Sequence, residues 1–122
     1  MGHSIIEIDM NQITQVIINE YVQIIREIFG AHLKKVILYG SYARGDYKSD
    51  SDIDILILVD LGDLEIKKLG RLLSDATFDI NLENDIDIKP IAKNESHFNR
   101  WITNYPFYKN VSNDGVILYD VA

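Results

Sequence analysis

Acidic side chains at close spacing are the part of this sequence best suited to chemistry. Asp52 and Asp54 lie in a run of isoleucine, leucine and valine, where aspartate is unusual. Residues two apart in a strand share a face, so these two carboxylates lie side by side and repel each other. A divalent cation such as Mg²⁺, which takes carboxylate and phosphate oxygens together, relieves that repulsion. The alternative is structural: Asp52 caps the strand entry in an Asx-type turn and Asp54 is solvated.

A Gly-Ser turn precedes the aspartate pair by ten residues. The apolar residues 36–39 predict a short buried strand, which Gly40 ends. Ser41 then stands where a helix N-cap is expected, next to backbone N–H groups that have no intrahelical partner. A turn of this kind can bind phosphate oxygens. The turn and the pair together are much more specific than either alone.

A second acidic cluster lies near residue 87. In the expected strand 85–89, alternation places Asp85, Asp87 and Lys89 on one face and the isoleucines on the other. Pro90 lacks an N–H group, so we expect this strand to end there or to lie near a sheet edge.

The run GSYARGDYKSDSDIDI, residues 40–55, resembles the signature of the polymerase-β-type nucleotidyltransferases. It is most similar to the minimal nucleotidyltransferase (MNT) branch, which is known as the antitoxin partner of HEPN-domain ribonuclease toxins. A weaker resemblance extends through residues 86–91 to residues 106–108 and 114–119. The resemblance implies a polymerase-β-like nucleotidyltransferase fold and an enzyme that uses ATP with two Mg²⁺ ions.

The resemblance also implies roles for individual residues. Asp52 and Asp54 would bridge the metal ions, and Asp87 would complete the catalytic and metal-binding set. Asp85 is a rival for the third position, since alternation gives it the same face, but Asp87 matches the family pattern better. The residues implied in binding the phosphates of ATP are Gly40, Ser41 and Arg44. Arg44 could equally brace the loop through Asp46 or Asp50, and the sequence leaves both roles open.

Three functions of different classes are compatible with these residues. The first is transfer of AMP from ATP to a protein hydroxyl, which the resemblance implies is a tyrosine of a HEPN toxin that associates with this chain. The second is a non-catalytic antitoxin that binds its partner; the intact site argues against it. The third is a small-molecule transferase of the antibiotic-modifying type. With 122 residues the chain has little room for its own acceptor pocket, which favours an acceptor on a partner protein.

Composition limits the class of protein. The length predicts a single domain over residues 1–122, which the resemblance implies is a nucleotidyltransferase domain. The absence of cysteine excludes disulfides and thiolate metal sites. A net charge of −7 argues against direct binding to nucleic acid, whose partners present basic surfaces. No apolar run reaches the ~20 residues of a membrane span, and no secretory signal is visible. We therefore expect no membrane association and a cytoplasmic location.

The periodicity predicts an α+β fold: a small mixed sheet with helices packed mainly on one face and the carboxylates on the other. The caps expected for three of the helices are Asp9, Asp63 and Ser96. The first helix should bury a stripe of six residues, namely Ile13, Val16, Ile17, Tyr21, Ile24 and Ile28. Expected helices cover residues 9–29, 64 to about 78, 97 to about 105, and 106–113, with a polar loop at 81–84. Expected strands cover residues 36–39, 52–59, 85–89 and 116–119.

Overall fold

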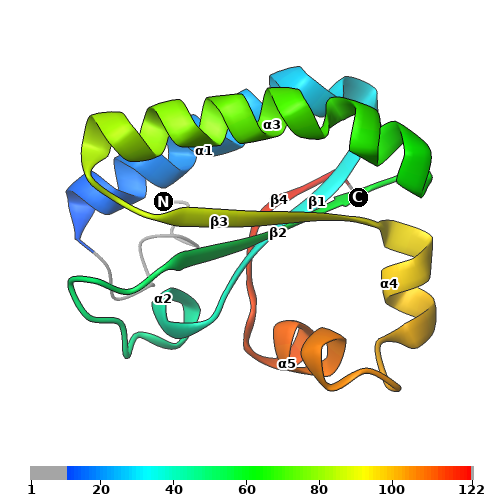
Figure 1. Cartoon of the computed structure of the whole chain (residues 1–122). Coiled ribbons are helices and arrows are strands. Elements are labelled where there is room, and N and C mark those ends of the chain that lie inside the picture. The colour runs from blue at the N-terminus through cyan, green and yellow to red at the C-terminus, as the bar shows by residue number, and fades with distance from the viewer. Residues whose placement is uncertain (1–10, 122) are drawn as a thin grey trace.

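A four-stranded mixed sheet forms the centre of the molecule (Figure 1). The structure is a computed structural model, and it describes residues 11–121. The strands lie in the order β3-β2-β1-β4; β1 is antiparallel to β2 and β4, and β2 is parallel to β3. Their bounds are β1 (Leu33–Tyr39), β2 (Ile53–Val59), β3 (Ile88–Asn94) and β4 (Val116–Asp120). The predicted mixed sheet is confirmed.

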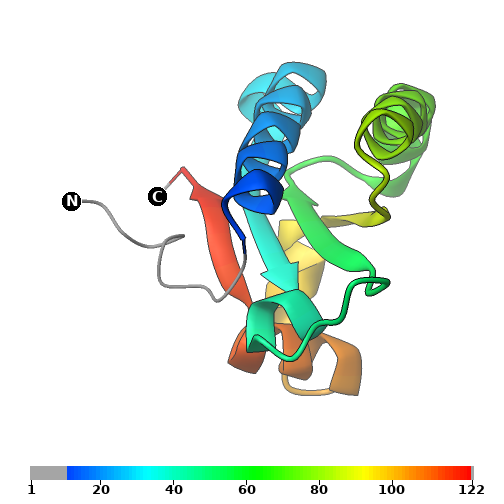
Figure 2. The same ribbon diagram turned by 90° about the vertical axis from the view of Figure 1, so that its left-hand side faces the viewer.

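Helices lie on both sides of this sheet, but the two long ones share one face. These are α1 (Gln12–Phe29) and α3 (Asp63–Asn84), which run antiparallel to each other (Figures 1 and 2). On the opposite side, α4 (Glu95–Trp101) and α5 (Pro106–Asp114) cover part of the sheet. The four-residue helix α2 (Ser41–Arg44) follows the end of β1, and the short 3-10 helix η2 (Gly30–His32) links α1 to β1. The α+β fold expected from the periodicity is therefore observed.

Alternation along β2 divides the molecule into two chemically different halves. Ile53, Ile55, Ile57 and Val59 belong to the large core beneath α1 and α3. Leu56 and Leu58 face the other way, into a smaller core shared with α4 and α5. The residues of this smaller core are Ile37, Leu56, Leu58, Phe98, Tyr108 and Val111. Asp52 and Asp54 continue this second face beyond the end of its apolar part.

The first helix begins and packs differently from the expectation. The predicted cap Asp9 lies outside the described residues, and the structure caps α1 with Asn11, whose Oδ1 accepts from the N–H of Thr14 at 2.8 Å. Ile13 and Val16, assigned to the buried stripe, are 75% and 57% exposed. They border a shallow hollow beside Asn84, at the end of α3. The side chains that α1 buries are Thr14, Ile17, Ile18, Tyr21, Val22, Ile25 and Phe29.

The third helix is longer than predicted and includes the residues expected to form a polar loop. Its N-cap is Gly62, and Asp63 is the first helical residue. Asn81 stays in the helix because its side-chain amide makes two hydrogen bonds to Ile88, the first residue of β3. It accepts from the N–H of Ile88 at 2.8 Å and donates to the carbonyl of Ile88 at 3.1 Å. The amide of Asn84 donates to the carbonyl of Ile80 at 2.8 Å. The polar side chains that suggested a loop are thus used in bonds, those of Asn81 to the neighbouring strand and that of Asn84 within the helix itself.

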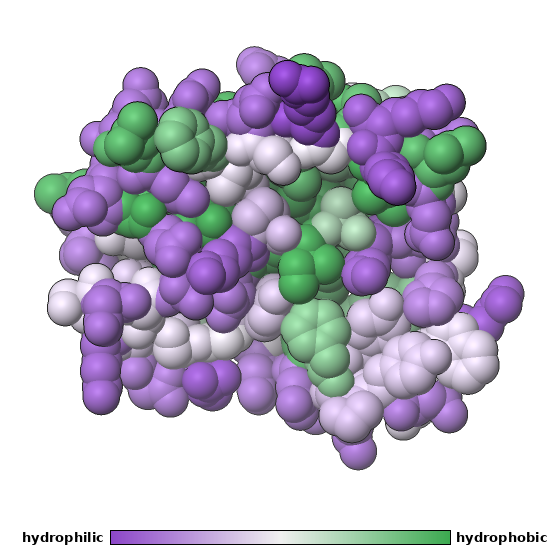
Figure 3. Space-filling view, in the orientation of Figure 1, coloured by the Kyte–Doolittle hydropathy of each residue, from purple (hydrophilic) through white to green (hydrophobic). Residues whose placement is uncertain are grey.

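The outer surface of α3 carries exposed apolar residues, which weaken the apolar periodicity of this helix. Leu64, Leu72, Phe78 and Leu82 are all more than half exposed, so apolar residues occur on both sides of the helix. Figure 3 shows this surface, along the upper edge, as apolar groups interspersed with polar ones. A single apolar face, which sequence patterns detect, is therefore absent.

Strand β3 begins later and ends later than expected. It spans Ile88–Asn94 and passes through Pro90, which pairs with Ile55 of β2. The expected position near a sheet edge is confirmed, and that position is the reason the strand continues, because an edge strand needs hydrogen bonds on one side only. Asp85 lies outside the strand: it is the left-handed residue that ends α3, with φ of 53°.

The remaining boundaries differ by a few residues. Strand β1 is longer than predicted because Lys34 and Lys35 join it, with their ammonium groups 3.4 Å and 3.9 Å from carboxylates of Asp60 and Asp120. Helix α4 is capped by Asn94, whose Oδ1 accepts from the N–H of His97 at 2.9 Å, and not by Ser96. Helix α5 and strand β4 are confirmed. Among residues 11–121, no helix has the length and apolar character needed to cross a membrane.

Candidate active site

The turn after β1 brings Gly40 against Asp54. Tyr39 at the end of β1 pairs with Asp54 in the antiparallel register, so the next residue lies beside the carboxylate. Gly40 has φ of 79°, and a Cβ added there would collide with Oδ2 of Asp54. Backbone conformation and close approach therefore both require glycine at this position.

Helix α2 starts directly after this glycine. Its N-cap is Gly40, so Ser41, expected as the cap, is instead the first helical residue. The N–H groups of Ala43 and Arg44 both donate to the carbonyl of Gly40 at 3.1 Å, so the amides of Ser41 and Tyr42 are the ones left for the predicted phosphate-binding turn. Nε of Arg44 lies 3.3 Å from Oδ2 of Asp46, so the bracing role left open by the sequence is the one seen here.

The stacked rings of Tyr42 and Tyr47 support the polar loop between α2 and β2. The ring centroids are 4.2 Å apart and the planes are within 9° of parallel. Tyr42 is buried in the large core, so the stack attaches the loop to the body of the molecule. The N–H of Lys48 donates to Oγ of Ser51 at 2.8 Å, closing the turn that leads to Asp52.

The predicted carboxylates Asp52, Asp54 and Asp87 lie together on the face of the sheet that is opposite α1 and α3. Asp52 immediately precedes β2, Asp54 is its second residue, and Asp87 immediately precedes the parallel strand β3. A bond of 2.9 Å from the N–H of Ile53 to the carbonyl of Asp87 aligns the two strand entries. Asp54 is only partly accessible, and burial, together with the charges of Asp52 and Asp87, raises its carboxyl pKa above the ordinary value despite nearby positive charge.

Lys89 contributes most directly to that positive charge. Its ammonium nitrogen lies 3.7 Å from Oδ2 of Asp52 and 3.7 Å from Oδ2 of Asp87. Lys89 is also the register partner of Asp54. The sequence pattern placed Lys89 on the same strand face as Asp87, but it gave no reason to assign it a function. Lys89 is thus a site residue that sequence reasoning missed, although the signal was present.

Tyr39 is a second residue that the sequence did not identify. Its ring lies edge-on to Phe107 of α5 at 5.4 Å between centroids, which connects the site to the smaller core. Burial, and next the neighbouring charge of Asp54, raise the pKa of the Tyr39 hydroxyl to about 12. Tyr39 therefore stays neutral beside the carboxylates.

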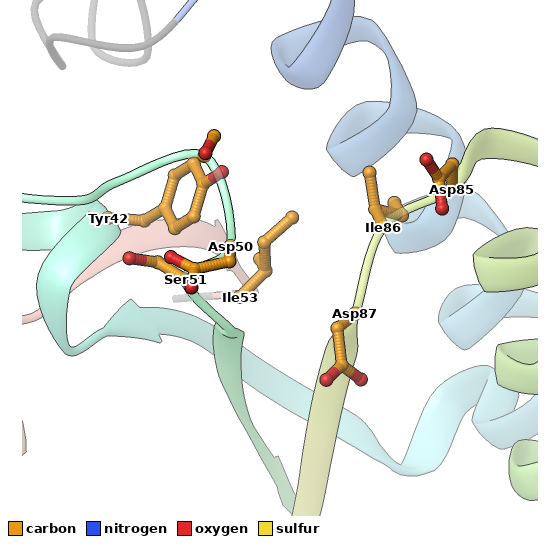
Figure 4. A pocket seen from close by; sticks show the side chains of 8 residues that line it. Tyr42, Asp50, Ser51, Ile53, Asp85, Ile86 and Asp87 are labelled. Atoms are coloured by element: carbon orange, nitrogen blue, oxygen red, sulfur yellow. The ribbon is translucent and has the colours of Figure 1, made fainter.

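The structure separates Asp85 from Asp87. Figure 4 shows their side chains leaving the same segment in different directions, with Asp85 beside the helices and Asp87 pointing along the strand. Both residues line a cavity of about 320 Å³ between this segment and the loop before β2, together with Asp50 and Ser51 (Figure 4). Asp52 and Asp54 do not line that cavity. Of the two residues compared, Asp87 is the one joined to the carboxylate pair, because Lys89 contacts both Asp87 and Asp52.

The donor set of the site fits a hard divalent cation, although the carboxylates do not enclose one as they stand. All three predicted ligands offer carboxylate oxygens, the donors that Mg²⁺ prefers. Within residues 11–121, no three acidic or histidine side chains converge closely enough to hold a metal ion. The ammonium of Lys89 lies between two of the three carboxylates. A metal site here therefore has the required ligands but needs a rearrangement of side chains.

Comparison with known proteins identifies the family. A family described as "nucleotidyltransferase domain" matches residues 18–112, which is more than half of the chain. This chain belongs to the nucleotidyltransferase domain family. The family match includes the Gly40 turn and all three carboxylates, and it confirms the resemblance seen in the sequence. The chain is accordingly an enzyme of the nucleotidyltransferase class.

Two relatives within the family come from Methanocaldococcus jannaschii. "Putative protein adenylyltransferase MJ0604" is 40% identical over 103 residues, which cover 84% of this chain and 94% of the relative. "Putative protein adenylyltransferase MJ0141" is 41% identical over 75 residues, which cover 62% of this chain and 74% of the relative.

Solved structures share the nucleotidyltransferase fold. One is a toxin–antitoxin structure with AMP-PNP, 20% identical, with a TM-score of 0.51 over 84% of this chain and 73% of that chain. Another, described as a putative nucleotidyltransferase from Sulfolobus solfataricus, is 21% identical, with a TM-score of 0.53 over 99% of this chain and 91% of that chain. At these identities the comparison establishes the fold.

Proposed function

We propose that this nucleotidyltransferase transfers AMP from ATP to a hydroxyl group of a partner protein and so acts as an antitoxin. The observation that carries the proposal is the grouping of Asp52, Asp54 and Asp87 beside the Gly40 turn. Relatives named as protein adenylyltransferases support AMP as the transferred group and a protein as the acceptor.

The turn at Gly40 is suited to the triphosphate. Because Gly40 has no side chain, phosphate oxygens can approach its backbone closely, and the hydroxyl and first-turn amides at Ser41 can donate to the β- and γ-phosphates. Arg44 braces the loop through Asp46 and adds positive charge on the same side as the site. These residues hold the leaving group and orient the α-phosphorus toward the carboxylates.

Asp52, Asp54 and Asp87 would hold two Mg²⁺ ions, in keeping with the all-carboxylate donor set. When bound, Mg²⁺ supplies positive charge that offsets the charge developing at the reacting phosphate and on the leaving group. The acceptor hydroxyl oxygen forms a bond to the α-phosphorus as the bond to the β-phosphate oxygen breaks, and pyrophosphate leaves. Asp87 accepts the hydroxyl proton, since it is the most exposed of the three carboxylates.

The proposed partner is a HEPN-domain ribonuclease toxin whose tyrosine receives AMP. A toxin–antitoxin structure with a nucleotide analogue has the same fold, which supports this type of partner. The net charge of −7 also suits association with a basic, RNA-binding protein. AMP added near the active site of the toxin would place an anion where RNA must bind.

Incubation of the purified chain with labelled ATP, Mg²⁺ and the product of the adjacent gene tests the proposal. We expect a mass increase of one or more AMP units on a tyrosine of that product, and no increase with Asp52→Asn or in EDTA. Asp85→Asn changes a neighbouring carboxylate that is not one of the three proposed metal ligands. It is the matched control and should retain transfer. Inhibition of the partner by Asp52→Asn without any label transferred would favour antitoxin action by binding alone.

A further inference from the structure

The ammonium group of Lys89 occupies the position that a cation would need. It lies 3.7 Å from Asp52 and 3.7 Å from Asp87, so it joins the entry of β2 to the entry of β3. Both carboxylates belong to the proposed metal ligands. An ordinary surface ion pair involves one acid, whereas this lysine contacts two of the three acids in one site and is the register partner of the third.

We propose that Lys89 is the internal counter-ion of the nucleotide-free site, and that a divalent cation binds Asp52 and Asp87 only when this ammonium group moves aside. The inference rests on the proposed function, because it concerns the same metal ligands. An ammonium group and a metal ion compete for the same oxygens and repel each other, so both cannot contact Asp52 and Asp87 at once. The failure of the acids to enclose a metal as they stand agrees with this competition.

Lys89 is able to move. Its side chain is 56% exposed and carries its charge on a flexible four-carbon stem. A triphosphate bound at the Gly40 turn would offer new acceptors on the same face of the sheet, because Gly40 adjoins Asp54 and Asp54 pairs with Lys89. The nucleotide would then draw the ammonium group away from the carboxylates. Metal and nucleotide should therefore bind cooperatively, so that each one strengthens the binding of the other.

Calorimetric titration with Mn²⁺ tests this directly, without any transfer reaction. Lys89→Gln removes the charge, and Lys93→Gln is the matched control, because Lys93 lies on the same strand and face but pairs with Leu58. Without nucleotide, we expect Lys89→Gln to bind Mn²⁺ about tenfold more tightly than the unchanged protein, and Lys93→Gln to match the unchanged protein. Lys89→Arg, which keeps the charge, should also bind weakly.

The same titrations with the α,β-methylene analogue of ATP, which cannot release AMP, complete the test. In the unchanged protein the analogue should strengthen Mn²⁺ binding by about tenfold or more, and in Lys89→Gln by clearly less. Equal nucleotide-free affinity for Mn²⁺ in Lys89→Gln and the unchanged protein would overturn the inference while leaving the proposed function intact. Absence of Mn²⁺ binding in every protein, even with the analogue, would instead overturn the metal-dependent function itself.

Discussion

The two faces of the central sheet use the same strands but satisfy opposite requirements. On the face toward α1 and α3, even the polar groups are fully paired: Thr77 donates to the carbonyl of Leu73 at 2.7 Å and therefore accepts, at 2.6 Å, from the hydroxyl of Tyr21. On the other face, burial and like charges oppose the ionisation of Asp54. One face is arranged for stability, and the other retains electrostatic repulsion that a bound cation or nucleotide would relieve.

Asp54 and its neighbour Ile55 make this comparison testable, because consecutive residues of β2 point to opposite faces. Asp54→Asn should lower the AMP transfer rate by about 10³-fold, since several kcal/mol of transition-state stabilisation depend on the ligand set. The melting temperature in EDTA should stay the same or rise, because the change removes repulsion. Retained transfer would contradict the catalytic role, and a clear loss of metal-free stability would favour a structural one.

Ile55→Ala should show the reverse pattern. Ile55 is fully buried in the large core, so truncation should lower the free energy of unfolding by about 3 kcal/mol. Transfer measured per folded molecule at low temperature should stay within a few-fold of the unchanged protein. Urea denaturation measures the loss, and Ile55→Val, expected to cost about 1 kcal/mol, is the graded control. A large loss of transfer in fully folded Ile55→Ala would show that the two faces are not independent.

Asp87 and Asp85 provide the next largest difference. Asp87→Asn should lower the transfer rate by about 10²-fold, the scale of a lost general base, and leave ATP affinity nearly unchanged. Asp85→Asn should have little effect, because Asp85 ends α3 and points away from the carboxylate group. Steady-state rates and calorimetry with ATP separate the two quantities. The opposite order of effects would exchange the roles assigned to these residues.

A smaller effect is expected on the stable face. Tyr21→Phe removes the donor to Thr77 in a fully buried position and should cost about 1 kcal/mol of unfolding free energy. In Thr77→Val the same change should cost less, because the Tyr21 hydroxyl then has no Thr77 hydroxyl to bond, and a double-mutant cycle gives the coupling energy. Additive effects of the two substitutions would mean that this hydrogen bond contributes nothing to stability.

The smallest effect concerns pH. The folded-state pKa of Asp54 lies above its ordinary value of 3.8, so its contribution to stability is present at lower pH and is lost as pH rises through the raised pKa. The stability of metal-free Asp54→Asn relative to the unchanged protein should therefore increase as pH rises above about 4. Asp60 is the control of opposite sign: the hydrogen bond from His32 lowers its pKa, so its contribution is lost as pH falls. Parallel curves of stability against pH for Asp54→Asn and Asp60→Asn would contradict the assignment.

Much of the site could be predicted from the sequence because its parts are local. Aspartates two apart in an apolar strand, and a glycine that ends the preceding strand, are visible in residues 36–59 without any tertiary information. The family resemblance added Asp87. The sequence could not show why position 40 must be glycine, since the collision involves Asp54, which is brought there by the pairing of β1 with β2.

Tertiary contacts decided the remainder. Asn81 reads as a loop residue in isolation, but two bonds to Ile88 keep it in α3; Pro90 reads as a strand end, but the edge position allows β3 to continue past it. Lys89 lies among the carboxylates because parallel pairing sets it opposite Asp54, a relation between strands 35 residues apart. Local residue order determined which groups are available for chemistry, and strand pairing, which depends on long-range hydrogen bonds, decided which of them meet.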